Sequence, residues 1–222
     1  MNSLIRRWTR FWMRFSGTGR LGRAACGLAG VFHPPFFGRV PLASLRGNGY
    51  FSPSSSIHHS DLVLGNNLFV GDRVLIYEDA GGGRIELGAG VHVHRDTAIQ
   101  TGAGGKVVIG DNTHIQPRCQ LSAYKGSISI GQQVEIAPNC SFYPYDHGMA
   151  ADTPIGRQAL LAGDIVIEDG VWLGVGVIVL NGVRIGKGAV IGAGSVVSKN
   201  IPDMAVAVGV PAKVVKYRSD AS

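Results

Sequence analysis

The chain has 222 residues, of which 45% are hydrophobic and 16% are charged. This mixture is apolar enough to fill a core, which excludes a wholly disordered chain. The net charge of +6 is unevenly placed, because residues 1–60 contain eight arginines and no acidic residue, whereas residues 61–222 contain 13 basic and 15 acidic residues. The basic character therefore belongs to an N-terminal arm, and the body of the protein is slightly acidic.

The N-terminal region shows no membrane span and no signal peptide that we would expect to be cleaved. Its longest apolar run, residues 24–32, is far shorter than the roughly 20 residues that cross a bilayer. Arg10 and Arg14 interrupt the position where a signal-peptide core would lie. The three cysteines lack metal-site spacing, so we expect reduced thiols and a cytoplasmic protein.

The first 15 residues favour an amphipathic helix. One face is apolar (Leu4, Trp8, Phe11, Trp12 and Phe15) and the other is mostly basic (Arg6, Arg7, Arg10 and Arg14). This composition is typical of a helix at the surface of an anionic membrane, which would be a peripheral contact through residues 3–15. A helix that caps the open end of a solenoid would have a similar composition. Nothing else in the chain supports nucleic-acid binding, and four prolines predict an irregular connector up to Ser60.

Aliphatic residues recur every six positions in the C-terminal half. The anchors of this repeat are Ile167, Leu173, Val179, Ile185, Ile191 and Val197. The third residue after each anchor is glycine or, at position 200, asparagine, and these residues tolerate positive φ at low cost. The spacing predicts short strands joined by corners, with three hexads closing one triangular coil. Successive coils stack as parallel strands about 4.8 Å apart.

The same register continues upstream with interruptions. Further coils begin at Leu64, Leu87, Ile109 and Ile130, and extra segments of 5, 4, 3 and 19 residues follow their third anchors. The stacked triangular coils form a prism, and all insertions should therefore leave this prism at one corner. We expect an all-β protein with about six triangular coils, divided into a basic arm (1–57), a β-helix (58–202) with a long loop (148–163), and a C-terminal tail (203–222).

Residues 64–217 resemble the hexapeptide-repeat acyltransferases, whose fold is a left-handed parallel β-helix. The likeness is to the maltose/galactoside acetyltransferase type and its polysaccharide O-acetyltransferase relatives. The matching motifs are Ile136-Ala137-Pro138-Asn139, Asp146-His147-Gly148, Asp164-Ile165-Val166-Ile167, Val171-Trp172-Leu173-Gly174, Ile191-Gly192-Ala193-Gly194-Ser195-Val196-Val197 and Val208-Gly209-Val210-Pro211-Ala212-Lys213. The resemblance implies a homotrimeric enzyme that transfers acetyl groups from acetyl-CoA to a sugar or glycan hydroxyl, as in polysaccharide or lipopolysaccharide biosynthesis.

His147 is the candidate catalytic residue. An imidazole is suited to accept a proton near neutral pH, and the resemblance implies that His147 deprotonates the acceptor for direct attack on the thioester. The alternative is an ordinary surface histidine. Asp146 is not expected to orient the ring, because neighbours in extended backbone point apart. The loop 148–163 is implied to reach a neighbouring subunit and wall the donor channel.

The resemblance also implies the contacts to the acyl donor, which are Val175, Ala193, Ser198 and Lys199, with Lys213 and Lys216 at the nucleotide phosphates. The two lysines have independent support, because phosphates attract cations and the body is otherwise slightly acidic. The acidic acceptor-site residue of the family is not matched, since residues 123–125 read Ala-Tyr-Lys. The identity of the acceptor therefore stays open, and no metal ligand is assigned.

Two other functions fit the same repeat. A metal-dependent hydrase of the γ-carbonic-anhydrase type is one, for which His92 and His114 lie in equivalent positions one coil apart. That family's paired histidines five residues apart are absent from the sequence. A non-catalytic scaffold is the other, and it would leave His147 dispensable.

A lipid-linked or polysaccharide precursor at the inner membrane face would suit a membrane-seeking arm.

Overall fold

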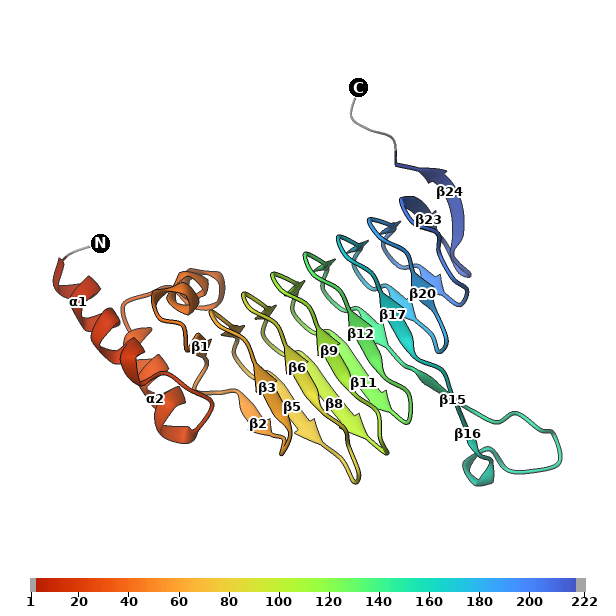
Figure 1. The fold of residues 1–222 in the computed structure, drawn as a ribbon, viewed down its shortest axis with the longest axis horizontal. Coiled ribbons are helices and arrows are strands. Elements are labelled where there is room, and N and C mark those ends of the chain that lie inside the picture. The colour runs from red at the N-terminus through yellow and green to blue at the C-terminus, as the bar shows by residue number, and fades with distance from the viewer. Residues whose placement is uncertain (1–2, 219–222) are drawn as a thin grey trace.

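The computed structural model describes residues 3–218, which form a triangular prism of parallel strands with helices at its N-terminal end (Figure 1). The first wall contains β1 (Tyr50–Phe51), β4 (Phe69–Val70), β7 (His92–Val93), β10 (His114–Ile115), β13 (Glu135–Ile136), β18 (Trp172–Leu173), β21 (Val190–Ile191), β23 (Ala205–Val208) and β24 (Lys213–Tyr217). The second wall contains β2 (Ser56–His58), β5 (Leu75–Glu78), β8 (Ala98–Gly102), β11 (Gln120–Tyr124), β14 (Ser141–Phe142), β19 (Ile178–Val179) and β22 (Val196–Val197). The third wall contains β3 (Leu62–Leu64), β6 (Ile85–Leu87), β9 (Val107–Ile109), β12 (Ile128–Ile130), β17 (Ile165–Ile167) and β20 (Arg184–Ile185).

The register of the walls stacks each hexad anchor on the anchor of the next coil. Leu173 pairs with Ile191, for example, and Val179 pairs with Val197. All four side chains are fully buried. Aliphatic residues from every coil thus form one continuous core inside the prism, which confirms the predicted parallel β-helix.

The prism has about seven turns, because the second wall contains seven strands, whereas the hexad pattern predicted about six. The additional turn is the first one, formed by β1 and β2 within the proline-rich stretch that was expected to be irregular. Phe51 takes the place of an aliphatic anchor there and pairs with Val70. Phe51 lies six residues before Ile57, which pairs with Ile76 of the next turn, but one hexad that begins at an aromatic residue is too short to reveal the repeat. The divisions at residues 57 and 202 remain predictions. The wall strand β1 lies before the first division, and β23 and β24 lie after the second.

The corners adopt the backbone conformation that the repeat requires. Five glycines, at positions 170, 176, 182, 188 and 194, have positive φ as predicted. In the upstream coils, non-glycine residues such as Arg73, Arg118 and Gln133 occupy equivalent positions with φ of 55–64°. The prediction for Asn200 was wrong, since its φ is not positive and its side-chain oxygen accepts a hydrogen bond from the Arg184 N–H.

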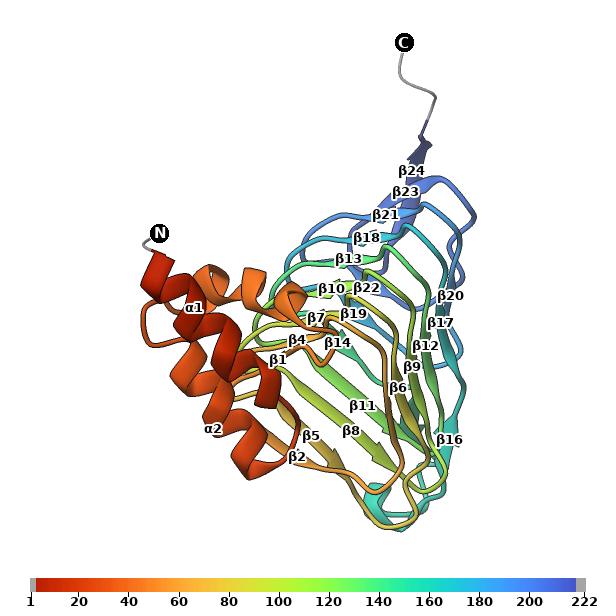
Figure 2. The same ribbon diagram turned by 60° about the vertical axis from the view of Figure 1, so that its left-hand side comes forward.

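The N-terminal residues form a helical cap on the first turn (Figure 2). The cap comprises α1 (Ser3–Trp12), the 3₁₀ turn η1 (Met13–Phe15), α2 (Arg20–Ala29) and the 3₁₀ segment η2 (Phe36–Leu45). Thr9 and Met13 are buried on the inner side of α1 and η1, and the Phe51 N–H donates to the Cys26 Sγ at 3.4 Å. The helix predicted at residues 3–15 is therefore present and packs as a cap. Within residues 3–218, no helix has the length and apolar character needed to cross a bilayer.

The long insertion forms a hairpin arm at the corner between the second and third walls, which we call the second corner. Strands β15 (Tyr145–His147) and β16 (Leu160–Ala162) pair antiparallel, with the short 3₁₀ turn η3 (Ile155–Arg157) near the tip. The three shorter insertions leave the prism at the same corner, as predicted, because each connects a second-wall strand to the next third-wall strand.

Candidate active site

His147 lies on the inner end of the arm. It ends β15 opposite Leu160 of β16, and its side chain is exposed. The base of the arm is closed by the Gly163 N–H, which donates to the Pro144 carbonyl oxygen at 3.0 Å, and by the Gly182 N–H, which donates to the Gly163 carbonyl oxygen at 2.9 Å. These bonds hold the strand that carries His147 at a fixed position on the second corner.

Asp146 fastens the arm to the next coil. Its carboxylate accepts a hydrogen bond from the Asn181 side-chain amide, and Asn181 lies at the second corner between β19 and β20. Because successive residues of a strand point to opposite sides, Asp146 is directed away from the imidazole of His147. Asn181 is a positioning residue that the sequence motifs did not reveal, since its partner lies 35 residues away.

The tip of the arm is ordered by one side chain. The Gln158 amide nitrogen donates to the carbonyl oxygen of Ala150 at 2.9 Å, and its amide oxygen accepts from the Ala150 N–H at 2.8 Å. Large apolar side chains nevertheless remain exposed on the arm, with 82% of Met149, 51% of Ile155 and 57% of Leu161 accessible to solvent. An ordered arm with an apolar surface is typical of a segment that packs on another molecule.

The residues expected at the acyl donor separate into two groups. Val175 and Ala193 lie at the corner between the first and second walls, the first corner, where the Gly194 N–H donates to the Val175 carbonyl oxygen at 2.8 Å. Ser198 and Lys199 follow β22 directly and therefore lie at the second corner, on the same edge of the prism as the arm. All four side chains are exposed. In one chain, the width of the second wall separates the two groups.

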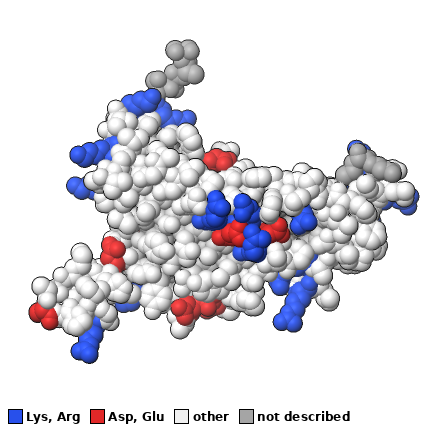
Figure 3. Space-filling model, turned by 180° about the vertical axis from the view of Figure 1, so that it is seen from behind, with Lys and Arg blue, Asp and Glu red and all other residues white. Residues whose placement is uncertain are grey.

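The remaining candidates lie on the C-terminal tail. Lys213 and Lys216 belong to β24, which pairs antiparallel with β23 and extends the first wall. The Ala212 N–H donates to the Val196 carbonyl oxygen at 2.8 Å, so the tail crosses the end of the second wall. Both lysines are exposed, and basic side chains gather at the C-terminal end of the prism (Figure 3). This end of the prism thus provides positive charge for an anionic ligand.

A cluster of tyrosines lies at the base of the arm that carries His147. The ring of Tyr145, two residues before His147, packs edge-on against Tyr124 at 5.7 Å and against Tyr143 at 6.2 Å between centroids. Burial and the nearby Asp79 carboxylate raise the pKa of Tyr77, with smaller contributions from Tyr145 and Tyr143. These tyrosines come from three coils, and the sequence analysis did not connect them. The only signal available was the similar place of each one after a second-wall anchor.

The histidines of the first wall form a separate group. The rings of His92 and His114 stack at 4.5 Å, and His114 Nδ1 lies 2.9 Å from the Glu135 carboxylate. The ring of His94 contacts the rings of Phe37 and Phe69. Burial lowers the pKa of both His92 and His94 to about 4. Across residues 3–218, no three His, Cys, Asp or Glu side chains converge in a way that would hold a metal ion.

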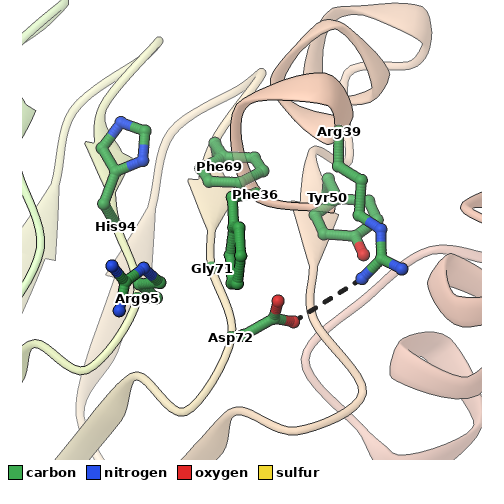
Figure 4. A pocket seen from close by; sticks show the side chains of 8 residues that line it. All are labelled: Phe36, Arg39, Tyr50, Phe69, Gly71, Asp72, His94 and Arg95. Carbon is green, nitrogen blue, oxygen red and sulfur yellow. Dashed lines mark ion pairs between the residues drawn. The ribbon is translucent and has the colours of Figure 1, made fainter. Parts of the chain in front are cut away.

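A small cavity lies between η2 and the first wall (Figure 4). The Arg39 guanidinium lies 3.7 Å from the Asp72 carboxylate, and the buried Tyr50 hydroxyl has no hydrogen-bond partner among the described residues. Burial raises the pKa of Tyr50 to about 12. The cavity has room for about one water molecule, so it does not fit a sugar or a nucleotide.

Sequence comparisons match this chain to known transferases. The family described as bacterial transferase hexapeptide (six repeats) matches residues 164–199. A probable acetyltransferase of Mycobacterium tuberculosis is 36% identical over 164 residues, covering 71% of this chain and 52% of that protein. A galactoside O-acetyltransferase of Lactococcus lactis is 34% identical over 157 residues, covering 71% and 63% respectively. The chain thus spans between half and two thirds of the lengths of these two relatives.

Solved structures share the fold. A polysialic-acid-specific acetyltransferase superposes with a TM-score of 0.59 at 26% identity, covering 76% of this chain and 87% of that one. A hexapeptide-repeat acetyltransferase of Vibrio cholerae, crystallised with acetyl-coenzyme A, superposes with a TM-score of 0.54 at 30% identity, covering 60% and 71% respectively.

With one further relative, the match extends over most of that protein's length. A dTDP-4-amino-4,6-dideoxy-D-glucose acyltransferase of Escherichia coli is 30% identical over 162 residues, which are 70% of this chain and 82% of that protein. The repeat, the prism and the arm that carries His147 are thus accompanied by homology over 82% of an acyltransferase, and the chain belongs to the hexapeptide-repeat acyltransferase family.

Proposed function

We propose that the protein is an acetyl-CoA-dependent O-acetyltransferase that acts on a hydroxyl of a sugar or glycan precursor, with His147 as general base. The observation that carries this proposal is the placement of His147. It is exposed on a strand fixed by the Asp146–Asn181 hydrogen bond, on the same edge of the prism as Ser198 and Lys199. The relatives that act on galactosides and polysialic acid support a sugar or glycan as the acceptor class.

The reaction is a direct transfer. The neutral imidazole of His147 accepts the proton of the acceptor hydroxyl while the hydroxyl oxygen forms a bond to the thioester carbonyl carbon. Collapse of the tetrahedral intermediate breaks the carbon–sulfur bond, and the imidazolium returns the proton to the departing thiolate. A backbone N–H beside the carbonyl would stabilise the developing oxyanion. A covalent route through cysteine is disfavoured, because Cys119 and Cys140 are buried and their thiols donate to the backbone carbonyl oxygens of Ala137 and Gly174 inside the prism.

The donor would lie along the prism edge with its phosphates at the tail. Lys213 and Lys216 are the cations for the nucleotide phosphates, and the exposed residues Val175 and Ala193 would line the pantetheine. Sugar rings commonly pack on aromatic side chains. Tyr124 and Tyr145 at the base of the arm could therefore take over the role of the missing acceptor-site carboxylate, which supports a sugar as the acceptor.

A homotrimer would bring the separated groups together. In one chain, Val175 and Ala193 lie at the first corner, whereas His147 and Lys199 lie at the second. Adjacent copies that place unlike corners face to face would complete each site in the groove between them, and the exposed apolar side chains of the arm would be covered by the neighbour.

The test is release of free CoA from acetyl-CoA by the purified full-length chain, measured against a panel of nucleotide sugars, simple galactosides and glycan oligomers. We expect acceptor-dependent CoA release with at least one sugar and mass-spectrometric detection of its O-acetyl product. Tight CoA binding without transfer to any acceptor would contradict the choice of acceptor class. Absence of measurable CoA binding would contradict the enzyme itself and favour the scaffold.

A further inference from the structure

The N-terminal cap has an outer surface that its capping role does not explain. The inner side of the cap uses Thr9 and Met13, which are 1% and 0% exposed. On the outer side, Trp8, Phe11 and Phe15 are 40%, 49% and 56% exposed. A helix that served only to close the solenoid would carry polar residues at these outer positions.

The outer rings form a continuous apolar stripe. This aromatic stripe consists of Trp8, Phe11, Phe15 and Phe32. Trp8 meets Phe32 at 6.2 Å and Phe11 meets Phe15 at 5.6 Å between centroids, and the half-buried Trp12 joins the two pairs at 5.7 Å from Trp8 and 5.3 Å from Phe11. The indole N–H of Trp8 donates to the Leu28 carbonyl oxygen at 2.7 Å. The polar atom of the indole is therefore satisfied inside the cap, while apolar ring surface remains accessible to solvent. Contiguous exposed apolar surface of this kind marks an interaction site.

An arginine stripe runs beside the rings. Arg7, Arg10 and Arg14 are spaced three and four residues apart, so they share one side of the helix, and they line an open groove together with Trp8 and Phe11. Among the residues that the structure describes, Arg39 is the one arginine of the first 60 residues that forms an ion pair. The arginine stripe is thus exposed positive charge without a local counter-charge.

We propose that this outer surface of the cap binds the surface of an anionic lipid bilayer. Aromatic rings favour the boundary between headgroups and acyl chains, and arginines beside them would contact anionic headgroups. The cap lies at the end of the prism opposite the C-terminal tail (Figures 1 and 2). A bilayer contact there would leave the arm and the tail lysines free to bind their ligands.

Two other occupants fit the surface less well. In a symmetric contact between two copies, the arginine stripes would lie close together and repel each other. Single-stranded nucleic acid stacks its bases on open ring faces, but the rings here pack edge to face, with interplanar angles of 82° for Phe11–Trp12 and 69° for Phe11–Phe15.

The test is co-sedimentation of the full-length chain with vesicles of phosphatidylcholine alone or with about 30% phosphatidylglycerol. We expect binding to the anionic vesicles only, weakened when salt rises from about 0.1 M to about 0.5 M. The variant Arg7→Gln/Arg10→Gln/Arg14→Gln should bind roughly a hundredfold more weakly. The control Lys106→Gln/Lys125→Gln/Lys187→Gln removes the same charge from exposed positions on the prism and should bind like the parent. Circular dichroism verifies that each variant is folded.

Several outcomes would overturn the proposal. These are equal binding to both vesicle types, no binding to either, an equal loss in the control variant, and a thymidine 20-mer that binds more tightly than the vesicles at the same salt concentration. A Phe11→Ser/Phe15→Ser variant should also lose vesicle binding. If it instead changed only the oligomeric state, a second copy of the chain would be the occupant. Vesicle binding does not require acetyl transfer, so failure of the proposed enzyme activity would leave this result unaffected.

Discussion

At the scale of single residues, His147 has a test with a matched control. His147→Ala should lower kcat about 10²–10⁴-fold, because the general base acts in the chemical step, and should leave the CoA dissociation constant nearly unchanged. Steady-state kinetics and calorimetric CoA titration measure the two quantities. His58 is also exposed but lies on β2 of the first turn, and His58→Ala should retain parental turnover. Equal losses in both variants would contradict the assignment.

A second prediction at this scale concerns His94 and stability. His94 is 4% exposed, and burial, with smaller contributions from His92 and His114, lowers its pKa to about 4. The unfolded chain, with an ordinary pKa near 6.5, binds a proton at a higher pH than the folded chain does. The fold therefore loses stability as pH falls from about 6.5 toward 4, by about 3 kcal/mol at most from this ring.

The measurement is the thermal midpoint of unfolding between about pH 4.5 and pH 7.5. Phenylalanine suits the site, because Phe37 and Phe69 already pack against the ring. His94→Phe should show a shallower fall of the midpoint on the acid side than the parent. Parallel curves for the parent and the variant would show that His94 does not contribute to the acid sensitivity.

At the scale of elements, the cap should stabilise the first turn through its inner side. Met13→Ala removes a fully buried side chain and should lower the free energy of unfolding by about 2–5 kcal/mol. Phe15→Ala, at an outer position 56% exposed, should change it by less than about 0.5 kcal/mol. Urea unfolding measures both variants. A larger loss from Phe15→Ala would mean that the aromatic stripe is structural and would weaken the case for a lipid contact.

The tail strand β24 carries a prediction about the acyl donor. Lys213→Ala/Lys216→Ala should raise the CoA dissociation constant roughly tenfold or more, because charge-assisted contacts to phosphate are lost. Dephospho-CoA, which lacks the 3′-phosphate, should lose less affinity on the same change. Calorimetric titration of both ligands distinguishes the outcomes, and equal losses would show that the two lysines do not contact the 3′-phosphate.

The elements also show how far the sequence could predict this molecule. The hexad is a local signal, so the walls, the corner glycines and the shared exit of all insertions followed from spacing alone. The first turn was missed because Phe51 replaces an aliphatic anchor. The arm was predicted as a loop, whereas β15 and β16 pair across 12 intervening residues. The Asp146–Asn181 bond and the tyrosine cluster depend on the stacking of different coils, which sequence spacing does not report.

At the scale of the whole molecule, the two groups of donor residues lie on different edges of the prism. Val175 and Ala193 lie at the first corner, whereas His147 and Lys199 lie at the second corner. Because the second wall lies between them, one chain cannot place both groups on a single thioester. The proposed trimer therefore predicts that each site combines residues of two chains, and light scattering should give three times the 23.4 kDa mass of one chain.

Mixed oligomers test this composite site directly. His147→Ala and Lys213→Ala/Lys216→Ala should each be nearly inactive at low acetyl-CoA concentration, but trimers assembled from both by co-expression should recover activity. If His147 and the lysines of one site come from different chains, about a quarter of the sites in a random mixture keep both intact. The control is a mixture of the two proteins purified separately and combined without subunit exchange, which should stay inactive. If the co-expressed trimers also stayed inactive, His147 and the lysines would serve one site from the same chain, and the donor would have to follow the second corner from the arm to the tail.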